Sequence, residues 1–125
     1  MEDSDELAPT LEVDVETPGN GTRVLILRGE LDVSTVPRFK EALGFALDDN
    51  PHPRLLVDLA EVTFIDSTAL MTLLGVLREL NRREGQLALA CSNPTVLRLF
   101  EVTRTTETFR IFPTRDGALG HLEAA

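Results

Sequence analysis

The stretch that most constrains the fold runs from Leu55 to Leu70. It opens with an apolar run of strand type, Leu55–Leu59, continues through a short connector that ends at Asp66-Ser67, and passes directly into a long helical pattern. Ser67 is a good N-cap for that helix, because a serine hydroxyl can accept a hydrogen bond from an unpaired backbone N–H of the first turn. The stretch therefore predicts a strand–loop–helix unit with Ser67 at the junction of loop and helix, beyond the carboxyl end of the strand. In α/β domains, functional groups usually lie at such junctions.

The helical pattern after Ser67 divides into two faces when it is read at about 100° per residue. One face is apolar and is expected to pack on a sheet: Ala69, Leu70, Leu73, Leu74, Val76, Leu77 and Leu80. The other begins with small residues and ends with charge: Thr68, Thr72, Gly75, Arg78, Glu79, Arg82 and Arg83. Met71 is the one large apolar residue on this polar face. Small residues let another protein approach the helix closely, and Met71 offers an adaptable contact beside them.

The rest of the chain alternates between strand and helix patterns after an opening hairpin. Strands are predicted at 11–16, 23–28, 86–91 and 106–112. Helices are predicted at 34–48, from Pro94 onward, and at 115–122. Gly85 is predicted to be the C-cap of the helix that follows Ser67. Such alternation predicts an α/β fold: a mostly parallel five-stranded sheet with an N-terminal hairpin and about four packed helices, connected by right-handed crossovers.

Composition and charge restrict the possible partners. At 125 residues the chain is expected to be one domain over 10–125, preceded by an acidic stretch, 1–9, that is expected to be disordered or, alternatively, to contact a partner. The net charge of −9 argues against nucleic acid, which needs a basic face. No apolar run has the length of a membrane span, and no secretory signal is recognisable. The single cysteine, Cys91, excludes an internal disulfide, fits a cytoplasmic location, and is interpreted as a core residue.

Enzymatic interpretations find little support in the sequence. His52 and His121 do not form the pattern of a Ser–His catalytic pair, so no catalytic residue is assigned. There is no glycine-rich phosphate loop and no Cys/His cluster, so neither a cofactor nor a metal is expected. Asp58 at a strand end suggests a phospho-receiver, but such a site needs a cluster of acids for Mg²⁺. We instead expect a structural role for Asp58, bonded to a backbone donor or to the Ser67 loop.

Three motifs in this order and spacing resemble the STAS-domain anti-sigma factor antagonists of bacteria. They are Gly29-Glu30-Leu31-Asp32, Val57-Asp58-Leu59 and the run from Val62 to Leu70. The resemblance covers roughly Leu11 to Leu119 and implies the same α/β architecture. In that family the serine after the aspartate is phosphorylated by a partner that is both anti-sigma factor and kinase, and the matching residue is Ser67. Many members have Ser-Gly where this chain has Thr68-Ala69, and both replacements are small.

The resemblance implies a binding switch. The unphosphorylated protein would bind a serine-kinase anti-sigma factor and release its sigma factor, phosphorylation of Ser67 would end that binding, and a phosphatase would restore it. The residues expected to contact the partner are Asp32, Asp66, Thr68, Met71, Thr72 and Gly75. Alternatives remain for each element of this interpretation. Ser67 and Asp32 could be helix caps only, and the chain could be a constitutive STAS adaptor in a transporter or signalling complex.

Overall fold

The computed structural model describes residues 10–19, 21–47 and 50–124, so the acidic stretch 1–9 lies outside the described residues. Five strands form one sheet in the order β1-β2-β3-β4-β5. Their bounds are Leu11–Glu16, Thr22–Leu31, Arg54–Ile65, Gln86–Ala90 and Ile111–Phe112. β1 runs antiparallel to β2, and every other neighbouring pair is parallel. The predicted α/β class, with a hairpin opening a mostly parallel sheet, is confirmed.

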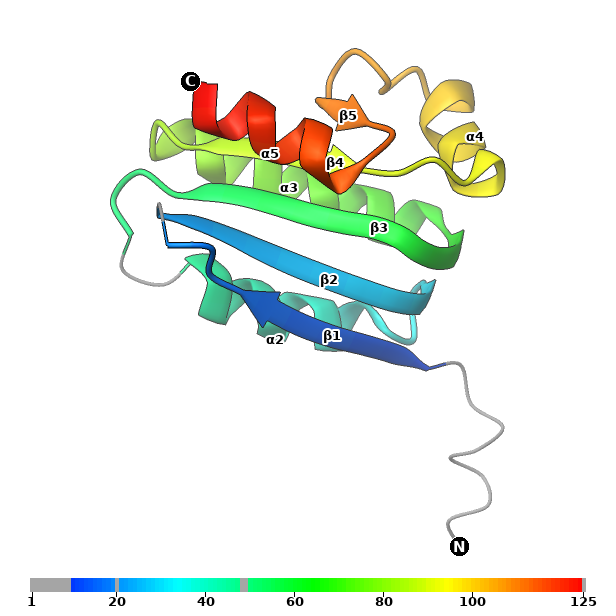
Figure 1. The fold of residues 1–125 in the computed structure, drawn as a ribbon. Coiled ribbons are helices and arrows are strands. Elements are labelled where there is room, and N and C mark those ends of the chain that lie inside the picture. Colours follow the sequence, from blue (N-terminus) through cyan, green and yellow to red (C-terminus); the bar gives the residue numbers. More distant parts are fainter. Residues whose placement is uncertain (1–9, 20, 48–49, 125) are drawn as a thin grey trace, which may run out of the picture.

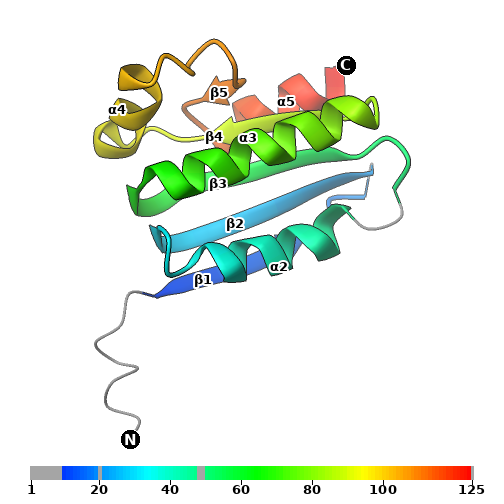
Figure 2. The same cartoon turned by 180° about the vertical axis from the view of Figure 1, so that it is seen from behind.

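Helices cover both faces of this sheet. α2 (Val36–Leu47) and α3 (Ser67–Arg82) lie side by side on one face, and α5 (Arg115–Ala124) lies on the other (Figures 1 and 2). The fourth helix, α4 (Pro94–Val102), contributes Val96 and Phe100 to the same core as α2 and α3. Strand alternation produces the two cores, since Leu55 and Val57 belong to the larger one and Leu56 to the smaller one under α5.

The two faces of α3 agree with the helical pattern of the sequence. Its fully buried residues all come from the predicted apolar face: Ala69, Leu70, Leu73, Val76 and Leu80. Leu74 and Leu77 are half-buried and pack against the same core. α3 is therefore held to the sheet along its length by one continuous stripe, which leaves the opposite face free for other contacts.

The end of α3 differs from the predicted Gly85 cap. Glu84 has the left-handed conformation, with φ of 58°, and its N–H donates to Asn81 O at 3.1 Å. The Gly85 N–H donates to Leu80 O at 2.7 Å, which completes a Schellman motif with Glu84 at the left-handed position. Gly85 is needed for a different reason, because a Cβ there would lie 2.2 Å from Pro53 O.

The last strand is much shorter than predicted. The prediction of a strand over 106–112 is wrong for its first five residues, and β5 contains only Ile111 and Phe112. The N–H groups of Thr108 and Phe109 both donate to Thr105 O, which bends the chain into a turn. Phe109 is buried with its ring 5.5 Å from that of Phe100, edge to face. Packing of this aromatic pair overrides the local alternation of the sequence.

Several further expectations are tested by the structure. α2 begins at Val36, two residues later than predicted, because residues 33–35 form a turn. The predicted end at Asp48 lies outside the described residues.

Asp58 is buried, and its Oδ1 accepts from Ala60 N at 2.9 Å, so it has the expected backbone donor. Cys91 is buried, and desolvation by burial raises the pKa of its thiol, as the core interpretation requires. Of the described helices, none is long and apolar enough to cross a membrane.

Leu73 provides a test of the α3 core. Its side chain is fully buried in the larger core, so Leu73→Ala removes packed volume that the sheet cannot refill. We expect the free energy of unfolding to fall by about 2–5 kcal/mol. Chemical denaturation measures it, with Arg78→Ala on the exposed face of the same helix as the control, for which we expect a change within about 0.5 kcal/mol. Equal losses in the two variants would contradict the assignment of faces.

Candidate functional site

The ends of two parallel strands bring the candidate residues together. β2 and β3 are in register at Leu31 and Ile65, so Asp32 and Asp66, the next residues of each strand, lie at the same edge of the sheet. The Asp66 N–H donates to Leu31 O at 3.2 Å, which ties the two strand ends to each other. Asp32 and Asp66, which are 34 positions apart in the sequence, thereby lie at one edge, and Ser67 follows Asp66 directly.

Asp66, not Ser67, is the N-cap of α3. Its backbone is extended, with φ of −115° and ψ of 179°, and its Oδ1 accepts from Ala69 N at 3.0 Å. The second oxygen, Oδ2, accepts from Val33 N at 3.0 Å and so joins the start of α3 to the loop between β2 and α2. The prediction that Ser67 caps this helix is therefore wrong, since the cap position needs the non-helical backbone that Asp66 has.

Ser67 occupies the first position of α3 and is exposed. Its hydroxyl has no hydrogen-bond partner among the residues that the structure describes. The side chain therefore carries no part of the local structure. It stands at a helix N-terminus, where the partial positive charge of the helix favours an anion.

Asp32 holds the loop that enters α2. Its Oδ1 accepts from Ser34 N at 2.9 Å, from Ser34 Oγ at 2.7 Å and from Thr35 N at 3.2 Å. The hydrogen bond from the Ser34 hydroxyl is the main cause of a lowered pKa for the Asp32 carboxyl, which is therefore ionised at neutral pH. These bonds hold the turn that precedes α2, which begins at Val36, so Asp32 has a structural role but does not cap the helix itself. Its charge nevertheless remains at the surface beside Asp66.

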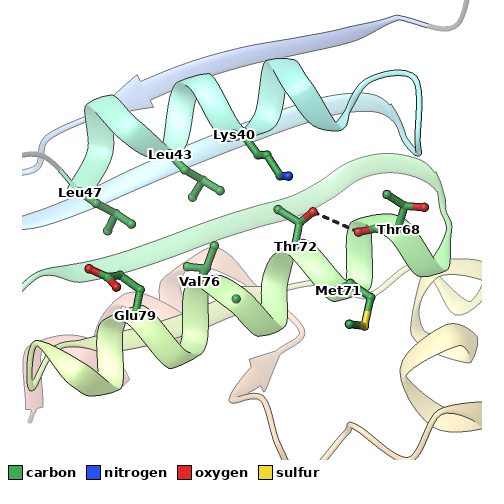
Figure 3. Close-up of a pocket in the computed structure, with 9 residues that line it drawn as sticks. Lys40, Leu43, Leu47, Thr68, Met71, Thr72, Val76 and Glu79 are labelled. Atoms are coloured by element: carbon green, nitrogen blue, oxygen red, sulfur yellow. Dashed lines mark hydrogen bonds between the residues drawn. The ribbon is translucent and has the colours of Figure 1, made fainter.

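The polar face of α3 borders a groove against α2. The groove has a volume of about 480 Å³, and its lining residues come from both helices: Lys40, Leu43, Leu47, Thr68, Met71, Thr72, Gly75, Val76 and Glu79. Thr72 is half-buried, lies toward α2, and donates from Oγ1 to Thr68 O at 3.0 Å (Figure 3). Met71 also lines the groove, at its outer rim, with its side chain directed away from α2. The four predicted contact residues of α3 therefore form a continuous strip from the Ser67 turn along this groove.

Two apolar residues near Ser67 were not among the predicted contacts. Val33 is 67% exposed and its N–H is bonded to Asp66, and Phe64, two residues before Asp66, is 46% exposed. Met71, one turn after Ser67, is 60% exposed. Exposed apolar side chains at one end of a sheet are typical of a protein-binding surface. Val33 lies next to Asp66 because β2 pairs with β3, which the sequence pattern does not show. Phe64, near the end of β3, is exposed where a strict alternation of buried and exposed residues continued from Val62 would bury it. The sequence pattern therefore did not single out either residue.

The chemical groups at this edge are few. In the described part of the chain, no group of three or more His, Cys, Asp or Glu side chains could hold a metal ion. The site consists of a free hydroxyl, two carboxylates engaged with backbone N–H groups, and an apolar rim. Such a set can bind a protein and accept a modification, and it contains no base bonded to the hydroxyl.

Substitutions of Asp66 and Ser67 are expected to have different effects on the free energy of unfolding. Asp66→Ala loses the cap on Ala69 and the tie to Val33, and we expect it to lower the free energy of unfolding by about 2 kcal/mol. Ser67→Ala loses no hydrogen bond and should stay within about 0.5 kcal/mol. Chemical denaturation of the two variants beside wild type measures both values. A larger loss for Ser67→Ala than for Asp66→Ala would mean that the hydroxyl is the cap after all.

Comparison with known proteins identifies relatives in sequence and in fold. The sequence profile of the STAS domain matches residues 12–118. The protein named anti-sigma-B factor antagonist of Listeria monocytogenes is 33% identical over 87 residues, which is 70% of this chain and 75% of that one. An anti-sigma factor antagonist from Mycobacterium paratuberculosis has a similar crystal structure, with a TM-score of 0.81 and 29% identity over 91% of this chain and 95% of that one.

A further solved structure shares the fold at lower identity. The anti-sigma factor antagonist SpoIIAA in its unphosphorylated form has a TM-score of 0.76 with 23% identity, over 91% of this chain and 98% of that one. The phosphorylated form of SpoIIAA, from Bacillus, also superimposes, with a TM-score of 0.69 and 23% identity over 88% of this chain and 98% of that one. Taken with the profile match over most of the chain, these relatives show that the chain belongs to the STAS domain family.

Proposed function

We propose that this chain is an anti-sigma factor antagonist whose binding is switched by phosphorylation of Ser67. Its unphosphorylated form binds a serine-kinase anti-sigma factor and releases the sigma factor, and a phosphatase restores that form. Relatives that carry the antagonist name support the binding role. The observation that carries the switch is the free, exposed hydroxyl of Ser67 beside a cap made by Asp66.

The position of the cap makes modification compatible with the fold. If Ser67 were the cap, a phosphate on its oxygen would remove a hydrogen bond that starts α3. Because Asp66 supplies that bond, the Ser67 hydroxyl can be esterified while the Asp66–Ala69 and Asp66–Val33 contacts persist. The unphosphorylated and phosphorylated forms of SpoIIAA both match this fold, so the fold of that protein is compatible with phosphorylation.

A phosphate on Ser67 would experience two opposing fields. The N-terminus of α3 attracts an anion, by up to about 1 kcal/mol at an exposed position. The carboxylates of Asp66 and Asp32 repel it, and the phosphate adds about −1.5 to −2 charges at neutral pH. We infer that the fold changes little, whereas the edge of the sheet gains a concentrated negative charge and a bulky group.

The surface around Ser67 defines the kind of partner. It combines an apolar rim, made by Val33, Phe64 and Met71, with the carboxylates of Asp32 and Asp66. A complementary partner has apolar side chains for the rim and basic groups at the carboxylates, in keeping with a net charge of −9 on this chain. Phosphorylation would disturb such an interface by desolvating a dianion against the apolar rim.

Phosphorylation can be tested on protein isolated from its native cells. We expect phosphate-affinity electrophoresis to resolve two forms, and mass spectrometry to locate the phosphate on Ser67. In pull-downs from native lysate, Ser67→Ala should retain the anti-sigma partner, whereas Ser67→Asp should lose it, because the aspartate places an anion at the switch position. Both variants should unfold near the wild-type midpoint. Absence of phosphate, together with equal capture by both variants, would favour the constitutive adaptor instead.

Two helical glycines provide a matched test of the docking face. Gly75 lies on the exposed face of α3 and Gly120 on α5 across the sheet, and a Cβ at either one meets no atom within 4 Å. An arginine at either position should raise helix stability by up to about 1 kcal/mol. Gly75→Arg should nevertheless weaken capture of the anti-sigma partner, because it places a long cation in the interface, whereas Gly120→Arg should not.

Thermal melting beside a binding titration measures both effects in the two glycine variants. Wild-type affinity in a Gly75→Arg protein that melts normally would remove this face of α3 from the interface. Equal weakening in both variants would indicate a general effect of added positive charge rather than a docking face.

A further inference from the structure

The outer edge of β4 is only half covered by β5. The two strands pair at Leu89 and Ala90, where Leu89 N donates to Arg110 O and Cys91 N donates to Phe112 O, both at 2.8 Å. Figure 1 shows β5 as a short arrow beside β4. The preceding segment cannot continue the ladder, because it bends into the turn at Thr105–Phe109.

This leaves the backbone of Leu87 open. In a parallel ladder, successive residues direct their N–H and C=O groups to opposite neighbours. Gln86 N donates toward β3, to Pro53 O at 2.9 Å, and Leu89 N donates toward β5, so the N–H and C=O of Leu87 also face the β5 side. In the described part of the chain, no backbone group bonds them there. Leu87 is 5% exposed as a residue and lines the cleft described next.

A polar cleft of about 320 Å³ lies at this open edge. Four elements contribute its lining, namely α3, the start of β4, the segment before β5, and α5: Leu77, Asn81, Gly85, Gln86, Leu87, Thr108, Arg110 and His121. The lining contains amides, a hydroxyl, an imidazole and a guanidinium, and it contains no carboxylate. A cleft of this composition, in a chain with a net charge of −9, is suited to an anionic group.

Arg110 supplies the cation of the cleft. Its side chain is exposed, and none of the carboxylates that the structure describes forms an ion pair with it. Other arginines of the fold do have such partners, as Arg28 does with Asp14 and Glu61. A planar guanidinium binds a carboxylate through two parallel hydrogen bonds. The cleft thus places a carboxylate receptor next to a backbone N–H and C=O that match a peptide group.

We propose that this cleft binds the carboxyl-terminal end of a peptide. The terminal carboxylate pairs with Arg110, and the last peptide group continues the ladder on Leu87, in the manner of strand addition at a sheet edge. The limited volume and the turn at Thr105–Phe109 restrict the ligand to a chain end rather than a long strand. Asn81 and Gln86 offer side-chain amides to the same ligand.

The cleft is far from the Ser67 site in the fold. β4 starts beside the start of β3, where Gln86 is in register with Arg54, whereas Ser67 follows the opposite end of β3. A peptide end could therefore bind while the Ser67 edge contacts another protein. The proposal does not depend on the phosphorylation switch, and its failure would leave that switch untouched.

The experiment uses the full chain labelled with ¹⁵N, and acetyl-dialanine with a free carboxylate as the probe. In the free protein, we expect the Leu87 amide to exchange with solvent much faster than the Leu89 amide, which is bonded to Arg110 O. The probe should shift the Leu87 and Arg110 resonances in a saturable way and slow exchange at Leu87. The same peptide with an amidated end, and acetate alone, should each bind more weakly.

Two arginine variants complete the test. Arg110→Gln should weaken binding of the free-acid peptide about tenfold, as expected for the loss of a charged hydrogen-bond donor. Arg98→Gln, at an exposed arginine of α4 outside the cleft, should bind as wild type does. The proposal is overturned by a Leu87 amide already protected in the free protein, by no change at Leu87 at saturation, or by equal affinities of the free-acid and amidated peptides.

Discussion

The carboxylate of Asp66 is the contact on which the arrangement of the Ser67 edge depends. One oxygen accepts from Ala69 and starts α3, and the other accepts from Val33 and fixes the loop between β2 and α2. Its own N–H bonds Leu31 O at the end of β2. One residue therefore connects a strand end, a loop and a helix start. Without its carboxylate, the loop at Val33 and the start of α3 would each lose the hydrogen bond that joins them to this residue.

Because Asp66 performs the structural task, Ser67 is available for a different one. A hydroxyl with no structural bond can gain a charged group without loss of a helix cap, and the carboxylates beside it make the added charge costly for a docked partner. The proposed switch therefore works through the chemistry of a surface and needs no rearrangement of the sheet. The apolar rim of Val33, Phe64 and Met71 is the contact surface whose binding to a partner the added phosphate would weaken.

The sequence pattern predicted three local features incorrectly, namely the cap of α3, the length of β5 and the end of α3, and each difference has a physical cause. Serine and aspartate are equally good N-caps, so the Asp66-Ser67 pair could not reveal which of them has the extended backbone. The alternating residues before Phe112 favoured a longer strand, but burial of Phe109 against Phe100 bends the chain at Thr105. Glu84 takes the left-handed position that was expected for Gly85, because the glycine is required one residue later by the approach of Pro53. At β5 and at Gly85, contacts between residues distant in the sequence outweighed a local preference.

The sequence by itself determined the α/β class, the order of strands and helices, the buried face of α3 and the position of the Asp66-Ser67 junction. All of these follow from local periodicity, which the burial of apolar side chains enforces at each position. Only the tertiary structure decided which residue caps α3, that Val33 lies against Asp66, and that the edge of β4 is left open at Leu87. These depend on the register of paired strands and on packing between distant segments, because such contacts join residues whose separation along the chain carries no periodic signal.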